Sequence, residues 1–214
     1  MKKILIYGAG GHAAVVSDLL TGMRDFEIVG FIDDDFCKDG KQLYGYPIIG
    51  NPGKFININK DGNVNNMFIA IGDNKIRESL SIMFADFNFP TIVHTAAIIG
   101  NEVEIGCGTI IMPGAIVDAQ AKIGQHCIIN NRAIVGHGSI VEDFCHISGG
   151  AILSGQTIVK KGAFIGIGSC ITQKNQIGQN CIIGAGTIIT KNVPDNSFMF
   201  GNPARKVSNY LSNA

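Results

Sequence analysis

The feature that most constrains the fold of this chain is a six-residue repeat that runs without a slip from Val93 to Val193. An aliphatic residue occupies the first place of every hexad, and a small or thin residue occupies the fifth. A period of six fits neither an α-helix nor the simple alternation of a β-strand, and is typical of a hexapeptide β-helix. The first places are held by Val93, Ile99, Ile105, Ile111, Val117, Ile123, Ile129, Val135, Val141, Ile147, Leu153, Val159, Ile165, Ile171, Ile177, Ile183 and Ile189.

In such a fold each hexad supplies one short strand and one turn, and three hexads close a triangular coil. Residues that are three hexads apart therefore stack in one column, with coils about 4.8 Å apart. The first-place aliphatics point inward, and Cys127, Cys145 and Cys181 share one corner column as small apolar fillers. We predict a left-handed parallel β-helix over residues 91–214. The repeat stops after Pro194, and 198–214 should contain a loop, Gly201–Arg205, followed by a short terminal helix or tail.

The outer surface of this prism predicts an oligomer. By strand alternation, the residue before each inward aliphatic points outward. Two faces are apolar, with Ile98, Ile116, Ile134, Ile152, Cys170 and Ile188 on one and Ile110, Ile128, His146, Phe164 and Ile182 on the other. The third, mixed face carries Glu104, Lys122, Ile140, Ile158 and Gln176. Because two apolar faces exceed what a soluble monomer exposes, and packing around a threefold axis hides both, we expect a homotrimer with clefts between prisms.

The N-terminal ninety residues follow a different pattern. A buried strand over Lys3–Tyr7 leads into the glycine turn Gly8–Ala13, an apolar helical pattern over Val15–Leu20, and a second strand over Ile28–Ile32. Acidic residues, Asp33-Asp34-Asp35, follow directly. This order is typical of dinucleotide binding, in which backbone N–H groups approach a phosphate and an acid accepts from a ribose hydroxyl. The glycine pattern alone is equally compatible with a tight turn.

The remainder of this region completes a half-sized α/β unit. Met67–Ile71 predicts a third strand and Lys75–Phe87 a helix, while Pro47–Asn66 is rich in Gly, Asn and Pro and predicts a loop with room for one short strand. We therefore predict a small Rossmann-like domain over residues 1–90, with its boundary near Phe89-Pro90. Such a unit suits a mononucleotide or nucleotide-linked ligand better than a complete NAD.

Bulk properties narrow the function. The 214 residues carry 17 basic and 17 acidic side chains, so no net charge favours nucleic acid or an anionic membrane surface. The apolar run Ile4–Tyr7 is too short for a signal peptide, and no later run is long enough to span a bilayer. The six cysteines form no CxxC pair. We expect a cytoplasmic protein without disulfides.

Two histidines of the repeat are candidate site residues. His137 lies between Gly136 and Gly138 at a corner, which leaves its imidazole accessible, and His146 interrupts an apolar column. A satisfied core histidine is the alternative for His146. The two are nine residues apart, or half a coil, so we expect them to meet only across a subunit interface.

Several motifs together resemble one known family. They are Gly8–His12, Asp33-Asp34, Asn130 placed seven residues before His137, His146 placed nine after it, and the ending Asn202-Pro203-Ala204. The chain resembles the bacterial hexapeptide-repeat sugar acyltransferases, which include the sialic acid O-acetyltransferases and the N-acetyltransferases of UDP-4-amino-4,6-dideoxy sugars. The resemblance covers nearly the whole chain.

The resemblance implies a trimeric enzyme that uses acetyl-CoA and needs no metal. It implies that His137 is the general base, that His146 lines the cleft near the acetyl group, and that the N-terminal domain holds a nucleotide sugar. The implied substrate contacts are Gly10, Gly11, His12, Asp33, Asp34 and Asn130. The implied coenzyme contacts are His146, the Gly155 amide, Ile167, Ala185, Lys191 and Pro203.

One departure concerns the base itself. The family usually has Glu or Asp directly after the catalytic histidine to orient its ring, whereas this chain has Gly138. Glu142 is our candidate substitute, with Asp143 and Asp118 as alternatives.

The chemistry suits these residues independently of the family. An amine that attacks a thioester must lose a proton, and histidine, with a reference pKa near ~6.5, accepts it at neutral pH. A backbone N–H at a corner would stabilise the oxyanion, typically by ~3 kcal/mol. We predict direct transfer to the amine of a nucleotide-linked amino sugar.

Three alternatives stay open. They are O-acetylation of sialic acid, a non-catalytic nucleotide-sugar-binding trimer, which Gly138 favours, and a zinc site of the carbonic anhydrase type. The spacings of His126, His137 and His146, eleven and nine residues, argue against zinc.

Overall fold

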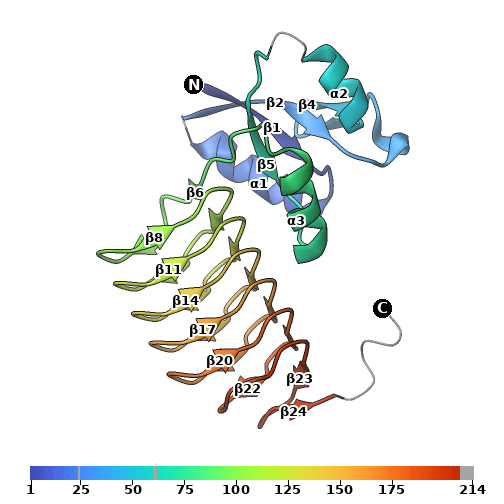
Figure 1. Cartoon of the computed structure of the whole chain (residues 1–214). Coiled ribbons are helices and arrows are strands. Elements are labelled where there is room, and N and C mark those ends of the chain that lie inside the picture. Colours follow the sequence, from blue (N-terminus) through green and yellow to red (C-terminus); the bar gives the residue numbers. More distant parts are fainter. Residues whose placement is uncertain (24, 60–61, 208–214) are drawn as a thin grey trace. The chain divides into compact units, whose positions relative to one another are not determined.

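The computed structural model describes residues 1–23, 25–59 and 62–207. The chain divides into two compact units, Met1–Pro90 and Thr91–Ala214. The two are called the N-terminal unit and the β-helix below, and each is described by itself (Figure 1).

The N-terminal unit is built on a five-stranded sheet with the strand order β3-β4-β2-β1-β5. Its strands are β1 (Lys2–Tyr7), β2 (Phe26–Ile32), β3 (Gln42–Leu43), β4 (Tyr46–Gly50) and β5 (Asn66–Ile69). All neighbours pair in parallel except β3, which is antiparallel to β4. Ile4, Leu5 and Ile6 are fully buried, as expected for a central parallel strand. The Rossmann-like sheet predicted from the sequence is confirmed, with β3 as an additional strand.

Four helical segments accompany the sheet: α1 (Gly11–Gly22), the 3₁₀ turn η1 (Phe36–Lys38), α2 (Pro52–Ile58) and α3 (Asn74–Met83). Over Pro47–Asn66 the short strand for which the prediction left room is present as β4, but the loop predicted for the rest is wrong, because α2 lies inside it. The Asn51 side chain accepts a hydrogen bond from the Lys54 N–H at 2.9 Å, and Pro52 occupies the first turn. Asparagine at the cap followed by proline is a helix start, so the signal was present.

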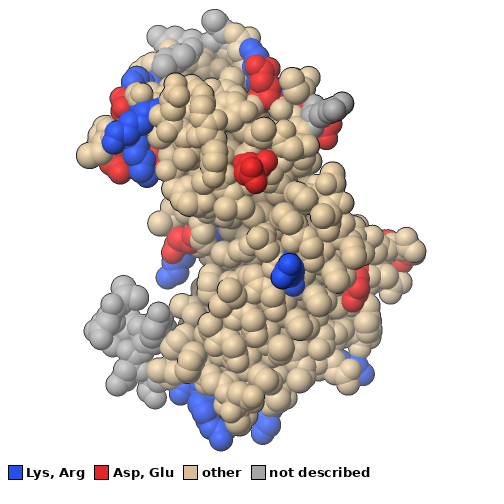
Figure 2. All heavy atoms as spheres, turned by 180° about the vertical axis from the view of Figure 1, so that it is seen from behind, with Lys and Arg blue, Asp and Glu red and all other residues tan. Residues whose placement is uncertain are grey.

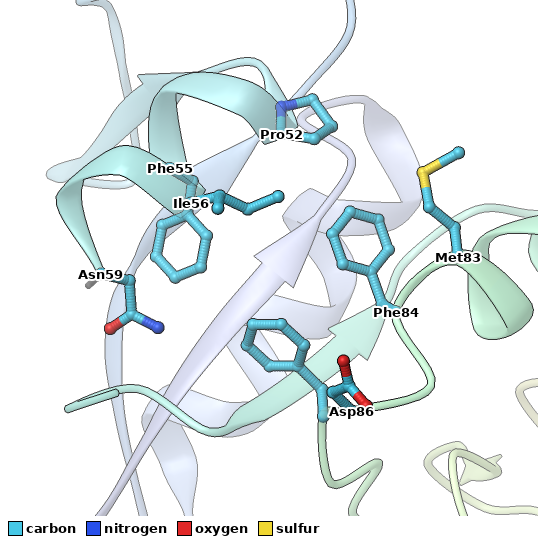
Figure 3. Close-up of a pocket in the computed structure, with 8 residues that line it drawn as sticks. Pro52, Phe55, Ile56, Asn59, Met83, Phe84 and Asp86 are labelled. Atoms are coloured by element: carbon cyan, nitrogen blue, oxygen red, sulfur yellow. The ribbon is translucent and has the colours of Figure 1, made fainter. Parts of the chain in front are cut away.

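A pocket of about 320 Å³ lies between α2 and the end of α3 (Figure 3). Its lining residues are Pro52, Phe55, Ile56, Asn59, Met83, Phe84, Asp86 and Phe87. The Phe87 ring packs at an angle against two others, with centroids 6.2 Å from Phe55 and 5.9 Å, edge-on, from Phe84. None of the predicted site residues lines this pocket.

The predicted β-helix is confirmed. Its two-residue strands run from β6 (Ile92–Val93) to β22 (Ile188–Ile189) and form three parallel sheets. Pairing joins residues one coil apart, as in Ile116↔Ile134. The strands between are β7 (Ile98–Ile99), β8 (Glu104–Ile105), β9 (Ile110–Ile111), β10 (Ile116–Val117), β11 (Lys122–Ile123), β12 (Ile128–Ile129), β13 (Ile134–Val135), β14 (Ile140–Val141), β15 (His146–Ile147), β16 (Ile152–Leu153), β17 (Ile158–Val159), β18 (Phe164–Ile165), β19 (Cys170–Ile171), β20 (Gln176–Ile177) and β21 (Ile182–Ile183).

The inward positions form one continuous core, and the corner cysteines belong to it. Cys127, Cys145 and Cys181 are fully buried, and each thiol donates to a carbonyl of the next coil. The S···O distances are 3.1, 3.2 and 3.0 Å. The thiols therefore fill the corners and also satisfy backbone acceptors.

Two findings modify the predicted surface. Ile110 and Ile128 of one apolar face are already buried in this chain, at 0% and 1% exposure. After the last coil, β23 (Phe198–Phe200) pairs in parallel with β21, and β24 (Arg205–Lys206) pairs antiparallel to β23. The predicted loop Gly201–Arg205 is a turn over 201–204 that joins these two strands, and Arg205 begins β24. Residues 208–214 of the predicted helix or tail lie outside the described residues. No helix in the described part of the chain is long and apolar enough to cross a membrane.

Candidate functional site

The carboxyl ends of β1, β2 and β5 meet at one edge of the N-terminal sheet, because these strands are parallel. Gly8 follows β1 with φ +99°, and a methyl group there would lie 2.8 Å from Ile71 Cδ1, so only glycine fits. Gly10 and Gly11 have no atom within 4 Å of the place of a Cβ. The predicted nucleotide loop is therefore open above Gly10 and Gly11, at the start of α1.

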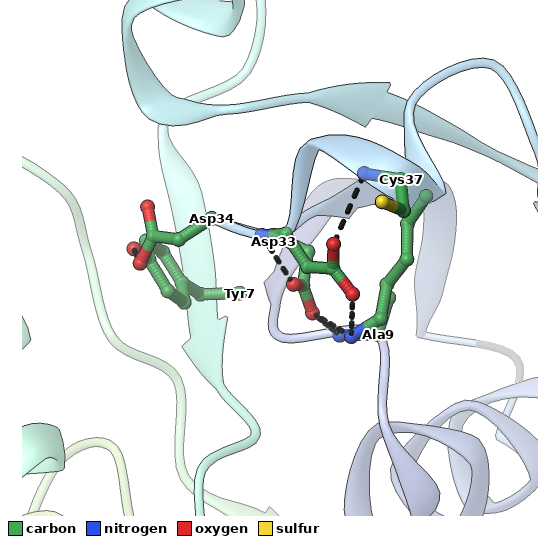
Figure 4. A network of polar contacts seen from close by, with 7 residues as sticks. Tyr7, Ala9, Asp33, Asp34 and Cys37 are labelled. Atoms are coloured by element: carbon green, nitrogen blue, oxygen red, sulfur yellow. Dashed lines mark hydrogen bonds and ion pairs between the residues drawn. The ribbon is translucent and has the colours of Figure 1, made fainter.

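Asp33 connects this loop to the segment that follows β2 by hydrogen bonds (Figure 4). Its Oδ2 accepts from the Ala9 N–H at 2.7 Å and from Lys38 Nζ at 2.9 Å, and its Oδ1 accepts from the Asp35 N–H at 2.9 Å. Burial alone would raise the pKa of Asp33, but the hydrogen bonds from Asp35, Lys38 and Ala9 hold that pKa below its usual value. Asp33 is thus ionised, and it holds the glycine loop through the Ala9 N–H.

Asp34 has a different environment. The Tyr7 hydroxyl donates to Asp34 Oδ2 at 2.7 Å, and burial together with this carboxylate raises the pKa of Tyr7, which stays protonated. Asp34 is exposed, and its Oδ1 has no hydrogen-bond partner among the described residues. Of the two predicted acids, Asp34 is the one with an acceptor left for a ligand.

His12 lies in the first turn of α1, beside the buried Arg77 of α3. Burial and the Arg77 charge lower the pKa of His12 to about 4, so its ring is neutral at pH 7. Arg77 donates to the carbonyls of Ile71 and Gly72 at 3.0 and 3.2 Å. Within the described residues, His12 Nε2 is buried without a hydrogen-bond partner. The edge of the sheet that is predicted to bind the nucleotide therefore contains a buried ring nitrogen, His12 Nε2, without a hydrogen bond among the described residues.

We expect His12 to make folding acid-sensitive. Between pH 6.5 and 4 the unfolded chain binds a proton at His12 and the folded chain does not, so the free energy of unfolding falls as the pH decreases. The loss should reach up to about 3 kcal/mol. Urea unfolding at pH 7 and 4.5 should show a smaller difference for His12→Gln than for the wild type. Equal differences in the two proteins would contradict this assignment.

In the β-helix, His137 lies at the corner between β13 and β14, with its side chain exposed. Its imidazole lies on Gly155, which occupies the same corner one coil later. A Cβ on Gly155 would overlap His137 Nε2 and would lie 2.7 Å from Cε1 and 2.8 Å from Cδ2. The Gly155 N–H donates no hydrogen bond to any described residue. The structure therefore brings the predicted base and the predicted amide donor together.

His146 lies on β15, where its ring packs edge-on against Phe164 at 5.0 Å between centroids. Asn130 Nδ2 lies 3.3 Å from His146 Nε2. The Asn130 amide is oriented by its Oδ1, which accepts from the Asn131 N–H at 2.8 Å, so Nδ2 must face the histidine. Since Nδ2 can only donate, His146 Nε2 accepts and Nδ1 carries the proton.

The candidate substitutes for an acid at position 138 have other contacts. Glu142 Oε2 accepts from the Lys161 N–H at 2.9 Å, and Asp143 Oδ1 accepts from the Gln125 N–H at 2.7 Å. Both bonds lie at the next corner of the coil, between β14 and β15. Asp118 lies one coil before Gly136, which is the residue that precedes His137. The contacts of Glu142 and Asp143 do not link either side chain to His137.

Four of the predicted coenzyme residues lie at the two corners that flank the β13–β16–β19 face. They are Gly155, Ile167, Ala185 and Lys191. Ile167 and Ala185 stack at the corner that precedes this face, where the Gly186 N–H donates to the Ile167 carbonyl at 2.8 Å. Ile167 is 63% exposed. Lys191 shares the following corner column with His137 and Gly155, and is exposed, as is Pro203.

The C-terminal half of the β-helix is basic. Figure 2 shows Lys and Arg spheres, without Asp or Glu, at the lower end of the face in view. From 157 to 207 the only acidic residue is Asp195, whereas the basic ones are Lys160, Lys161, Lys174, Lys191, Arg205 and Lys206. This half of the prism therefore attracts anions.

The three histidines of the zinc hypothesis lie apart. His126 is buried against Phe144, with stacked rings 5.3 Å apart, whereas His137 and His146 have the separate contacts described above. In the described portion of the chain, no group of three His, Cys, Asp or Glu side chains is arranged to hold a metal.

Two family models match parts of this chain. Residues 3–84 match the PglD N-terminal domain, and residues 111–202 match the GMPPB C-terminal domain. A curated relative, the UDP-N-acetylbacillosamine N-acetyltransferase of Bacillus subtilis (strain 168), is 35% identical over 113 residues. That match covers 51% of this chain, and the chain thus spans about half (50%) of the length of this relative.

Solved structures match almost the whole chain. The acetyltransferase domain of PglB from Neisseria gonorrhoeae FA1090 is 30% identical, with a TM-score of 0.87 and coverage of 97% of this chain and 100% of that one. The same domain has been solved in complex with acetyl coenzyme A. A histidine-to-asparagine variant of perosamine N-acetyltransferase from Caulobacter crescentus, in complex with CoA and GDP-perosamine, is 28% identical, with a TM-score of 0.91 and 98% coverage of both chains.

Proposed function

Because this chain belongs to the family of bacterial hexapeptide-repeat sugar acetyltransferases, we propose that it transfers the acetyl group of acetyl-CoA to the amine of a nucleotide-linked amino sugar, of the UDP-4-amino-4,6-dideoxy type. The observation that carries this proposal is the exposed His137 imidazole beside a Gly155 N–H that has no partner among the described residues. The relatives that bind CoA together with an amino sugar nucleotide support it.

In the proposed reaction, His137 removes a proton from the attacking amine while the amine nitrogen bonds to the thioester carbon. The Gly155 N–H donates to the oxygen on which negative charge develops. The C–S bond then breaks, and the coenzyme leaves as a thiol that takes up the proton from His137. No covalent acyl-enzyme is needed. The sugar amine is itself the nucleophile, and the product is an amide.

Asn130 and His146 form the opposite side of the proposed cleft. The amide of Asn130 is fixed by the Asn131 N–H and lies beside His146 Nε2. The half-buried His146 ring packs against Phe164, so the pair borders an apolar surface. Such a surface suits the methyl group of an acetyl.

We also propose that the protein is a homotrimer in the cytoplasm. His137 and Gly155 lie at one corner of the prism, whereas Ile167 and Ala185 lie at the other corner of the same face. Packing around a threefold axis brings unlike corners of neighbouring prisms together, so one cleft would use His137 of one subunit and His146 of the next. The free thiol state of all six cysteines suits a reducing compartment.

The coenzyme would lie along the prism with its phosphates toward the C-terminal coils. Gly155, Ile167 and Ala185 would contact the thioester and the pantetheine arm, and Lys191 and Pro203 the nucleotide end. The excess of basic side chains after residue 157 supports this direction, since the phosphates of CoA are anionic.

The proposal is tested by product analysis. The purified protein, acetyl-CoA and a panel of UDP-, GDP- and dTDP-linked amino sugars are incubated, and products are identified by mass spectrometry and NMR. We expect one acetyl group on the sugar amine, and no reaction with the hydroxyl analogue. Acetylation of free sialic acid would show the O-acetyltransferase alternative instead, and tight nucleotide-sugar binding without any product would show the non-catalytic one.

A further inference from the structure

Gly155 lacks a side chain where the His137 ring lies. Three atoms of that ring, Nε2, Cε1 and Cδ2, occupy the space that a Cβ on Gly155 would fill. Any other residue at position 155 must therefore displace the imidazole. The His137 main chain is held separately, because the Gln156 N–H donates to its carbonyl at 2.8 Å. Only the ring depends on Gly155.

A second imidazole in the same β-helix shows what such a contact does. A Cβ on Gly108 would overlap His126 Nδ1 and lie 2.9 Å from its Cγ. The other side of that ring is covered by Phe144, at 5.3 Å between centroids and an angle of 2°. His126 is 4% exposed and fixed on both sides. His137 rests on glycine in the same way but keeps its other side exposed.

We propose that Gly155 is a positioning residue for His137: the imidazole takes its orientation because position 155 has no side chain. The inference rests on the proposed function, in which His137 is the base. Position 138 holds glycine, and Glu142 and Asp143 are bonded to main-chain amides at another corner. Among the contacts of the described residues, packing on Gly155 is the one that restricts the ring of His137.

This arrangement couples two parts of the proposed chemistry. Gly155 supplies the N–H that would face the thioester oxygen, and the ring of the base occupies the space where a Gly155 side chain would lie. One residue therefore fixes the separation of proton acceptor and oxyanion donor. A displacement of about 1 Å from the productive geometry can cost about a hundredfold in rate.

Gly155→Ala separates the two roles, because alanine keeps the N–H and removes the space. The backbone of Gly155 is not in the left-handed region, and the overlapping atoms are the end of a flexible side chain, so the variant should fold normally. We expect kcat to fall by about ten- to a hundredfold. The KM for the nucleotide sugar and the thermal unfolding midpoint should match those of the wild type.

Gly22→Ala is the control for a glycine-to-alanine change. A Cβ on Gly22, the exposed last residue of α1, would meet no atom within 4 Å. Its kcat should stay within about twofold of the wild type, as for surface substitutions generally.

A double-mutant cycle with His137→Ala decides the mechanism. If Gly155 acts through His137, Gly155→Ala should have no further effect once the imidazole is absent. An unchanged kcat in Gly155→Ala, or an equal loss in both backgrounds, would overturn this inference and leave the proposed function intact. Normal turnover in His137→Ala alone would overturn both.

Discussion

Alanine in place of His137 should lower kcat at least about a hundredfold, as expected when a general base is removed. The amine would then have to lose its proton to water, which is neither positioned nor of matched pKa. The side chain is exposed and its loss leaves no cavity, so the fold should be unaffected. The rate is measured as release of free CoA thiol at saturating concentrations of both substrates.

His94→Ala is a suitable control for this variant. It removes another imidazole from the first coil, where His94 Nδ1 accepts from the Ala96 N–H at 2.9 Å. We expect near-normal turnover from it, because His94 lies in the first coil, two coils before Asn130 and four before the corner of Ile167. Near-normal turnover in His137→Ala would instead remove the base from the mechanism.

The β-helix could be predicted from the sequence because its period is local and repeated. Each inward aliphatic, such as Val135, lies one coil from its partner, so a single register fixes every strand pair. The same register stacks His137 and Gly155, which are three hexads apart, in one corner column. The N-terminal unit has no such repetition, and its Gly- and Asn-rich stretch concealed α2, although Asn51-Pro52 marked the helix start.

The candidate site was predicted less completely, because side-chain direction is not encoded in spacing. Tyr7, Lys38 and Arg77 were missed. Lys38 follows the acidic cluster by a few residues and was a detectable partner for Asp33. In contrast, Arg77 is an ordinary helix residue in the sequence, and only the tertiary fold buries it beside His12.

From the sequence, Asp33 and Asp34 are predicted to have the same role, whereas in the structure their carboxylates have different hydrogen-bond partners. Asp33 has its hydrogen bonds inside the loop, whereas Asp34 has one oxygen bonded to Tyr7 and one available. Adjacent residues at a strand end point to different sides, so one can stabilise the loop while the other meets a ligand.

Asp34→Asn should therefore raise the KM for the nucleotide sugar by about 10- to 100-fold, which is the loss of a hydrogen bond to a charged group. The asparagine oxygen still accepts from Tyr7, but the amide nitrogen that replaces Oδ1 is a donor and cannot accept from the ligand. We expect kcat to change little, because the sugar amine and the base are unaffected. Initial rates over a range of nucleotide-sugar concentrations provide both constants.

Asp33→Asn should behave differently, since the lost charge leaves Lys38 without its 2.9 Å partner and weakens the loop. We expect a lower thermal midpoint for that variant, whereas Asp34→Asn should unfold like the wild type. Asp35→Asn serves as the control, because its carboxylate accepts from the Cys37 N–H and lies 3.9 Å from Lys38 Nζ but has no hydrogen bond to the glycine loop among the described residues. If Asp34→Asn binds the nucleotide sugar normally, the ligand contact does not run through Asp34. The open edge above Gly10 and Gly11 would then have to hold the nucleotide by its backbone amides alone.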